Sequence, residues 1–180
     1  RTANYRPQTR KARSMVEHGK IGTIRHINAS MSSPLSWLFD NPQNRGWTEP
    51  TSDEMVGNGF CWGQSSHLLA WIYHVCPTLH PQKVFCAMNY SSVTNADVSH
   101  SATIVCSDLS SCNENNEISE GNNVIMSISG TSLLPGYEHS DPGVGKRISI
   151  AIYGTKGAIL YSGDDKDELS GKLKFRDNDT

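Results

Sequence analysis

The segment from Gly57 to His67, GNGFCWGQSSH, has the strongest chemical character in this 180-residue sequence. It combines glycines, a tryptophan and two serines at the point where a helix is expected to begin. Such residues weaken a helix, and breaches of local preference of this kind cluster at functional sites. Glycines let a ligand approach the backbone, and the first turn of a helix offers free N–H groups to a polar ligand. The segment therefore predicts a ligand-binding helix start.

A histidine at such a helix start is suited to proton transfer. The imidazole of His67 titrates near neutral pH, so it can take the hydroxyl proton while a carbinol is oxidised. Gln64 and Trp71 stand three residues before and four residues after it, which predicts that all three share one polar side of the helix. The alternative is a histidine at the edge of the core, bonded to a backbone carbonyl.

Other chemistries fit the residues less well. His67, His74 and Cys76 are spaced two helical turns apart, so they do not form one coordination sphere, and we predict no metal site. The serines beside His67 lack both a G-x-S-x-G elbow and an acid that would orient the histidine. The glycines of 143–146 have neither the spacing nor the setting of a phosphate loop. Hydrolysis and nucleotide binding by this chain are therefore not favoured.

Composition restricts the partners and the compartment. A net charge of −2 and a pI near 6.4 give no footprint for nucleic acid. No run of 18 apolar residues and no secretory signal are present, so we expect neither a membrane span nor secretion. Five cysteines without a C-x-x-C pair indicate reduced thiols and a cytoplasmic protein. Because the chain starts at Arg1 and already reads as folded there, we also expect a segment upstream of it.

The elements that position the helix start are an early helix, one strand, a second helix and then a run of strands. Periodicity predicts helices over 6–18 and 63–76, and strands over 23–31, 83–91, 102–109, 123–129, 147–153 and 158–161. The aromatic loop 32–56 either packs on the domain or lines a cleft, and 107–123 is typical of a long hairpin tip. We predict an α+β domain with an open, mostly antiparallel sheet and helices on one face. The other face then needs a partner or water.

Five stretches together resemble the C-terminal domain of the glucose-fructose oxidoreductase and inositol dehydrogenase group (Gfo/Idh/MocA). They follow the order and spacing of that domain over nearly the whole chain: Asn4-Tyr5-Arg6, KARSMVEHGKIGTIRHI at 11–27, Gly57 to His67, PQKVFCA at 81–87 and IYGTKGAILY at 152–161. The resemblance implies a dihydrodipicolinate-reductase-like fold. It also implies that residues 1–180 form a substrate-binding and oligomerisation domain.

The resemblance further implies a Rossmann domain earlier in the same protein, which holds NAD or NADP, and a sugar-like or polyol-like substrate. It implies a homo-oligomer that forms through the face of the sheet. Neither a G-x-G-x-x-G fingerprint nor the E-K-P lysine segment of the family occurs in these residues. We therefore expect no cofactor-binding residues in this chain and no catalysis by the chain alone.

Members of this family commonly carry a D-x-x-x-H pair at the second helix. His67 matches the histidine, but Gly63 stands where the aspartate would be, followed by Gln64. The leading hypothesis is an oxidoreductase acting on a CH–OH group, with His67 as its acid/base. Its expected substrate-side residues are Gln64, Trp62, Arg6 and Trp47. A non-catalytic binding or oligomerisation module is the alternative, which the missing aspartate favours.

Overall fold

The computed structural model describes residues 6–49, 58–109, 123–137, 139, 143–164 and 170–178. Its helices are α1 Pro7–Glu17, α2 Ser36–Phe39, α3 Arg45–Thr48, the π-helical turn η2 Cys61–Ser65, and α4 Ser66–Val75. Its strands are β1 Ile24–Ser32, β2 Leu79–Tyr90, β3 Asp97–Asp108, β4 Asn123–Thr131, β5 Arg147–Gly154, β6 Gly157–Gly163 and β7 Lys172–Asp177.

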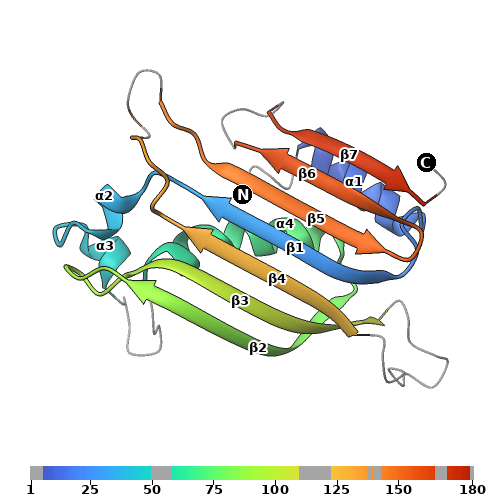
Figure 1. Ribbon diagram of the computed structural model, residues 1–180, viewed down its shortest axis with the longest axis horizontal. Coiled ribbons are helices and arrows are strands. Elements are labelled where there is room, and N and C mark those ends of the chain that lie inside the picture. Colours follow the sequence, from blue (N-terminus) through green and yellow to red (C-terminus); the bar gives the residue numbers. More distant parts are fainter. Residues whose placement is uncertain are drawn as a thin grey trace.

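The strands form one seven-stranded sheet in the order β2-β3-β4-β1-β5-β6-β7 (Figure 1). Among the described strands only β1 and β4 run parallel, and the other neighbours are antiparallel. Helices α1 and α4 lie behind the sheet in Figure 1, with α2 and α3 at one end. The predicted α+β class, with an open and mostly antiparallel sheet, is confirmed.

Local signals define the first helix as expected. Pro7 occupies the first helical position, where a missing N–H costs nothing, and Gly19 follows the C-cap with φ +63°, a backbone conformation that favours glycine. The Lys20 N–H closes the last turn by donating to the Met15 carbonyl over 2.9 Å. Thr9 and Ala12 are buried, which fixes the face that packs inward.

The hydrophobic core lies between the sheet and the helices. Ile27, Ala29 and Met31 are buried on β1, whereas the residues between them face the other side. The matching side chains of α4 are Leu68, Trp71, Ile72 and Val75. The two periodicities, alternate residues on strands and one stripe on the helix, meet in this layer as the sequence predicts.

Several features differ from the sequence-based expectations. Strand β7 is not predicted, and the loop over 32–56 contains two four-residue helices. The expected hairpin tip joins β3 to β4, but residues 110–122 lie outside the described part of the chain.

Four described cysteines are free, and Cys112 lies outside the described residues. None of the described helices is long and apolar enough to cross a membrane.

Candidate functional site

The helix start has unusual geometry. Cys61–Ser65 form a π-helical turn before α4 continues as an α-helix, and single π-turns inside helices occur often at functional sites. Gly59 has φ +134°, and a side chain there would collide with Asp97. The Asp97 carboxylate accepts the Cys61 N–H over 2.6 Å, so a residue 36 positions away caps the helix. Burial raises the pKa of Asp97, although the hydrogen bond from the Cys61 N–H acts to lower it.

A cavity of about 680 Å³ opens beside this turn, within the size range of small-molecule sites. The helix, the end of the β2–β3 hairpin and α3 contribute to its lining: Thr48, Glu49, Asn58, Cys61, Trp62, Ser66, Leu69, Met88, Tyr90, Thr94, Asn95 and Asp97. Two carboxyl groups line it, and no described lining residue is basic. The cavity therefore favours a neutral, partly apolar ligand over an anion.

The thiol in this cavity is not a nucleophile at neutral pH. Burial, with a smaller contribution from the nearby Asp97 charge, raises the pKa of Cys61 to about 11. Nucleophilic chemistry requires the thiolate, which is scarce at such a pKa. Cys61 therefore contributes packing to the cavity wall.

The structure places His67 on a different side of the helix from this cavity. It is half-buried and faces a narrow gap above the sheet, beside Met31 and Tyr161. Trp71 is 2% exposed, and its ring stacks on Tyr161 with the centroids 5.3 Å apart. Gln64 is 7% exposed, and its side-chain oxygen has no hydrogen-bond partner. The polar side predicted from spacing is therefore not formed, because Gln64 and Trp71 both point into the protein.

The three other predicted site residues lie apart from His67. Arg6 is buried, and its Nη1 donates to the Ser170 carbonyl over 3.2 Å and to the Ser170 hydroxyl over 3.0 Å. Trp62 is 60% exposed and lines the cavity. Trp47 is 43% exposed and contacts the backbone at Gly63. The structure thus gathers both tryptophans at the helix start and leaves Arg6 against the segment that precedes β7.

A buried polar cluster under the helix start was not predicted. Ser65 Oγ and His100 Nε2 are 3.1 Å apart, and both residues are more than nine-tenths buried. Burial lowers the His100 pKa, and its Nδ1 has no partner. Although Ser65, His100 and Asp97 are the residue types of a hydrolase triad, the serine has no access for a substrate. The cluster therefore supports the helix start from below.

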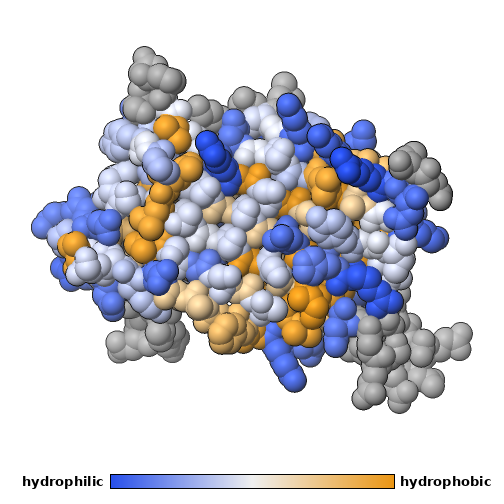
Figure 2. Space-filling model, in the orientation of Figure 1, coloured by the Kyte–Doolittle hydropathy of each residue, from blue (hydrophilic) through white to orange (hydrophobic). Residues whose placement is uncertain are grey.

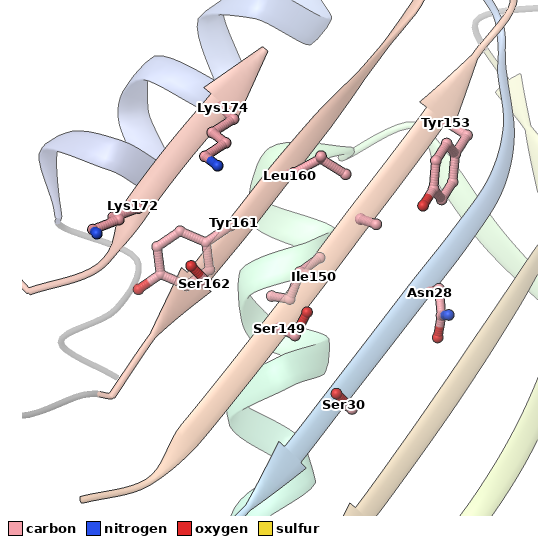
Figure 3. Close-up of a pocket in the computed structure, with 11 residues that line it drawn as sticks. Asn28, Ser30, Ser149, Ile150, Tyr153, Leu160, Tyr161, Ser162, Lys172 and Lys174 are labelled. Atoms are coloured by element: carbon pink, nitrogen blue, oxygen red, sulfur yellow. The ribbon is translucent and has the colours of Figure 1, made fainter. Parts of the chain in front are cut away.

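A second, smaller depression lies on the open face of the sheet, away from the helices. Figure 3 shows polar side chains from four adjacent strands around it, among them Ser30 on β1, Ser149 on β5, Ser162 on β6 and Lys172 on β7. Its volume is about 360 Å³. Among the described residues of the whole chain, no group of three His, Cys, Asp or Glu side chains could hold a metal ion.

Comparison with known families agrees with this architecture. The family model described as "GFO/IDH/MocA C-terminal domain" matches residues 9–160, so the chain belongs to this family. The comparison with curated proteins finds no match.

Among solved structures, the WlbA dehydrogenase from Bordetella pertussis, described in complex with NADH and UDP-GlcNAcA, superimposes with a TM-score of 0.66 at 14% identity. The alignment covers 97% of this chain and 45% of that one. An NAD⁺ complex of an inositol dehydrogenase homolog from Azotobacter vinelandii gives a TM-score of 0.62 at 12% identity, covering 99% and 43%. The chain thus spans less than half of either structure, and at these identities the likeness is one of fold.

Proposed function

We propose that this chain is the substrate-side domain of an NAD- or NADP-dependent oxidoreductase that acts on the CH–OH group of a sugar-like or polyol-like substrate. The observation that carries the proposal is the family match over residues 9–160, which includes the helix start with His67. Structures of the same fold are described with NADH, and one of them with NADH and myo-inositol. In this proposal the longer protein catalyses and the 180-residue chain alone does not.

The nucleotide would be held by a Rossmann domain outside this chain. The large cavity is unfavourable for a dinucleotide, because Glu49 and Asp97 line it and none of its described lining residues is basic. The nicotinamide, when bound, would accept the hydride. What this chain supplies is the positioning of the substrate and the acceptor for the hydroxyl proton.

We assign the proton transfer to His67, which sits in the first turn of α4. Trp62 and Trp47 provide exposed aromatic surface for the substrate at the same helix start. Gln64 and Arg6 belong to the same proposal, although both are buried. The unpaired side-chain oxygen of Gln64 would accept a substrate hydroxyl, and the helix start would have to move to admit one.

The test compares the longer protein with the 180-residue chain in nicotinamide oxidation and reduction, using polyols, sugars and keto-sugars. We expect turnover by the longer protein only, and a fall in kcat of about 10² or more in His67→Ala, as loss of a general base predicts. His74→Ala on the same helix is the matched control and should keep its turnover. No turnover and no binding of either cofactor by the longer protein would refute the oxidoreductase.

One observation favours the alternative, a non-catalytic binding or oligomerisation module. The helix carries no carboxylate at position 63, and the ring of Trp47 takes up that space. In that case the longer protein would bind a ligand or assemble without any turnover. The same assay, read together with ligand binding, separates the two functions.

We also propose that a second copy of the protein covers the open face of the sheet. No described element covers it, and Figure 2 shows its middle as pale, weakly polar surface between blue and orange patches. A row of small side chains crosses neighbouring strands there: Ser101, Ser129, Ser30, Ser149 and Ser162. Small residues leave room for close approach of a flat partner.

The mass in solution tests this assembly. Ser30→Arg places a long charged side chain in the middle of the open face, and we expect it to lower the mass measured by light scattering to that of a monomer. Ser14→Arg, at an exposed position of α1, is the control and should keep the mass of the unaltered protein. Equal masses for both variants and the unaltered protein would contradict the proposal.

The proposed location of the protein is the cytoplasm, which the free thiols of the described cysteines support.

A further inference from the structure

Gly63 at the helix start lies close to the ring of Trp47. A Cβ atom added to Gly63 would lie 2.8 Å from Cζ3 and 3.3 Å from Cε3 of Trp47, which is too close for the indole to stay in place. The ring of Trp47 therefore rests directly on the helix backbone where other residues would project a side chain. Glycine at 63 and tryptophan at 47 depend on each other.

The indole is fixed at one side and open at another. Its ring meets buried Phe39 edge-on with centroids 6.5 Å apart. The backbone N–H of Trp47 donates to the Asn44 carbonyl over 2.9 Å, which holds the residue at the start of α3. Nevertheless, 43% of the residue remains exposed. An anchored aromatic ring with free surface binds a flat ligand at low cost in conformational entropy, because its rotamer is already set.

The surroundings of this ring indicate the kind of ligand. Trp47 rests on Gly63, which lies in the π-helical turn immediately before α4 and His67. Trp62, the residue before Gly63, is 60% exposed and lines the large cavity. Charge is balanced beside it, because Glu49 pairs with Arg45 over 2.7 Å. The surface is thus apolar, flat and close to neutral.

We propose that Trp47, seated on Gly63, is a stacking platform that selects a neutral ring-shaped substrate over its open-chain equivalent. A cyclic polyol or pyranose presents a face of C–H groups that can be buried against an indole. An open-chain polyol gains the same contact only by freezing several bonds. This inference rests on the proposed function for the sugar-like or polyol-like nature of the substrate.

Fluorine NMR of 5-fluorotryptophan-labelled protein tests the platform without any need for turnover. The sequence has four tryptophans, so Trp→Phe variants assign the Trp47 signal. The ring probes are myo-inositol, methyl β-glucoside and methyl β-galactoside, and the open-chain probes are glucitol and galactitol. We expect at least one ring probe to shift the Trp47 signal saturably and neither open-chain probe to do so.

Paired variants locate the effect. Gly63→Ala should move the Trp47 signal and weaken binding of the ring probe about tenfold, the scale of one aromatic contact. Gly46→Ala is the control, since an added Cβ there meets nothing within 4 Å, and it should bind normally. Trp47→Ala, at an exposed position, should weaken binding as Gly63→Ala does. It replaces the glycine variant as the test if Gly63→Ala misfolds. Trp47→Phe should retain part of the affinity.

Three results would overturn the platform: no ring probe shifts Trp47, the open-chain probes shift it equally, or Trp47→Ala binds like the Gly46→Ala control. If no ring probe shifts the Trp47 signal, and that signal also differs between the 180-residue chain and the longer protein, another domain covers the ring and the platform is refuted. Saturable stacking without turnover by the longer protein would leave the platform standing and refute the dehydrogenase. Turnover by the longer protein without a shift of the Trp47 signal would refute the platform and leave the dehydrogenase standing.

Discussion

The same strands build two very different faces of the sheet. On β1, Ile27 and Met31 point toward the helices and are almost fully buried, whereas Asn28 and Ser30 point to the open side. On β5, Ile150 and Ile152 face the helices, and Ser149 and Tyr153 face outward. On these two strands the helix-covered face carries mainly apolar side chains, and the open face carries mostly polar ones.

This difference separates the residues that hold the fold from those available for contacts. Burial of branched side chains against α4 provides the main stabilising free energy, since each such side chain contributes about 1.5–3 kcal/mol. The open face contributes little to folding and is free to serve association. The helix-covered face also carries the polar cluster of Ser65 and His100, so it is not uniformly apolar. Substitutions at paired positions on the two faces should therefore differ in their effect on stability.

The largest effect is expected where the two faces are compared on adjacent residues of β5. Ile150→Ala removes buried methyl groups from a residue that is 1% exposed and should lower the free energy of unfolding by about 2–5 kcal/mol. Ser149→Ala, on the exposed side, should change it by no more than about 0.5 kcal/mol. Urea unfolding of both variants measures the difference. Similar values for the two would mean that the open face also carries folding energy.

A second comparison on β4 tests overpacking in place of cavity formation. A Cβ added at Gly130 would lie 2.5 Å from a ring carbon of His100, 2.8 Å from Phe60 and 3.0 Å from Ser65 Oγ. Gly130→Ala should therefore destabilise the protein by about 1–3 kcal/mol, because three buried groups must shift. Ser129→Ala, one residue away on the open face, is its control and should unfold like the unaltered protein. If Gly130→Ala costs nothing, the cluster under the helix start is looser than its distances imply.

Much of this fold follows from local sequence patterns. Alternation identified β1 and β5, and the apolar stripe of α4 together with Pro77 identified that helix and its end. Strand β7 was missed because its sequence, KLKFRD, carries four charged residues, and an edge strand of this kind has little apolar pattern to detect. The parallel pairing of β1 with β4 joins segments about 100 residues apart, and no local signal encodes it.

The candidate site shows the same limit. The glycine-rich helix start was visible because it violates local preferences, and His67 was visible through its position in that segment. The partners of the segment were not visible. Asp97 caps it from β3, and Trp47 rests on Gly63 from α3, and both contacts join residues distant in sequence. Helical spacing placed Gln64 beside His67 but could not show that Gln64 is buried. Local chemistry is readable from sequence, whereas its geometry requires the fold.

The smallest expected effect concerns pH and belongs to the histidine of the helix-covered face. Burial lowers the His100 pKa below its ordinary 6.5, and the charge of Asp97 partly offsets this. The unfolded chain then takes up a proton at a higher pH than the folded chain does. The stability contributed by neutral His100 is therefore complete above pH 6.5 and is lost as the pH falls through the lowered pKa.

Replacing His100 isolates this contribution from those of the other titrating groups. The unfolding free energies of the unaltered protein and of His100→Gln are measured in urea from pH 7.5 to pH 5. As the pH falls, the unaltered protein should lose more unfolding free energy than His100→Gln does. Ser65→Ala keeps the histidine and removes its hydrogen-bond partner, so it should lose about 1 kcal/mol at pH 7.5 and retain the pH dependence. A His100→Gln curve parallel to that of the unaltered protein would show that protonation of His100 does not oppose folding, and that the polar cluster tolerates a charge that the rest of this face excludes.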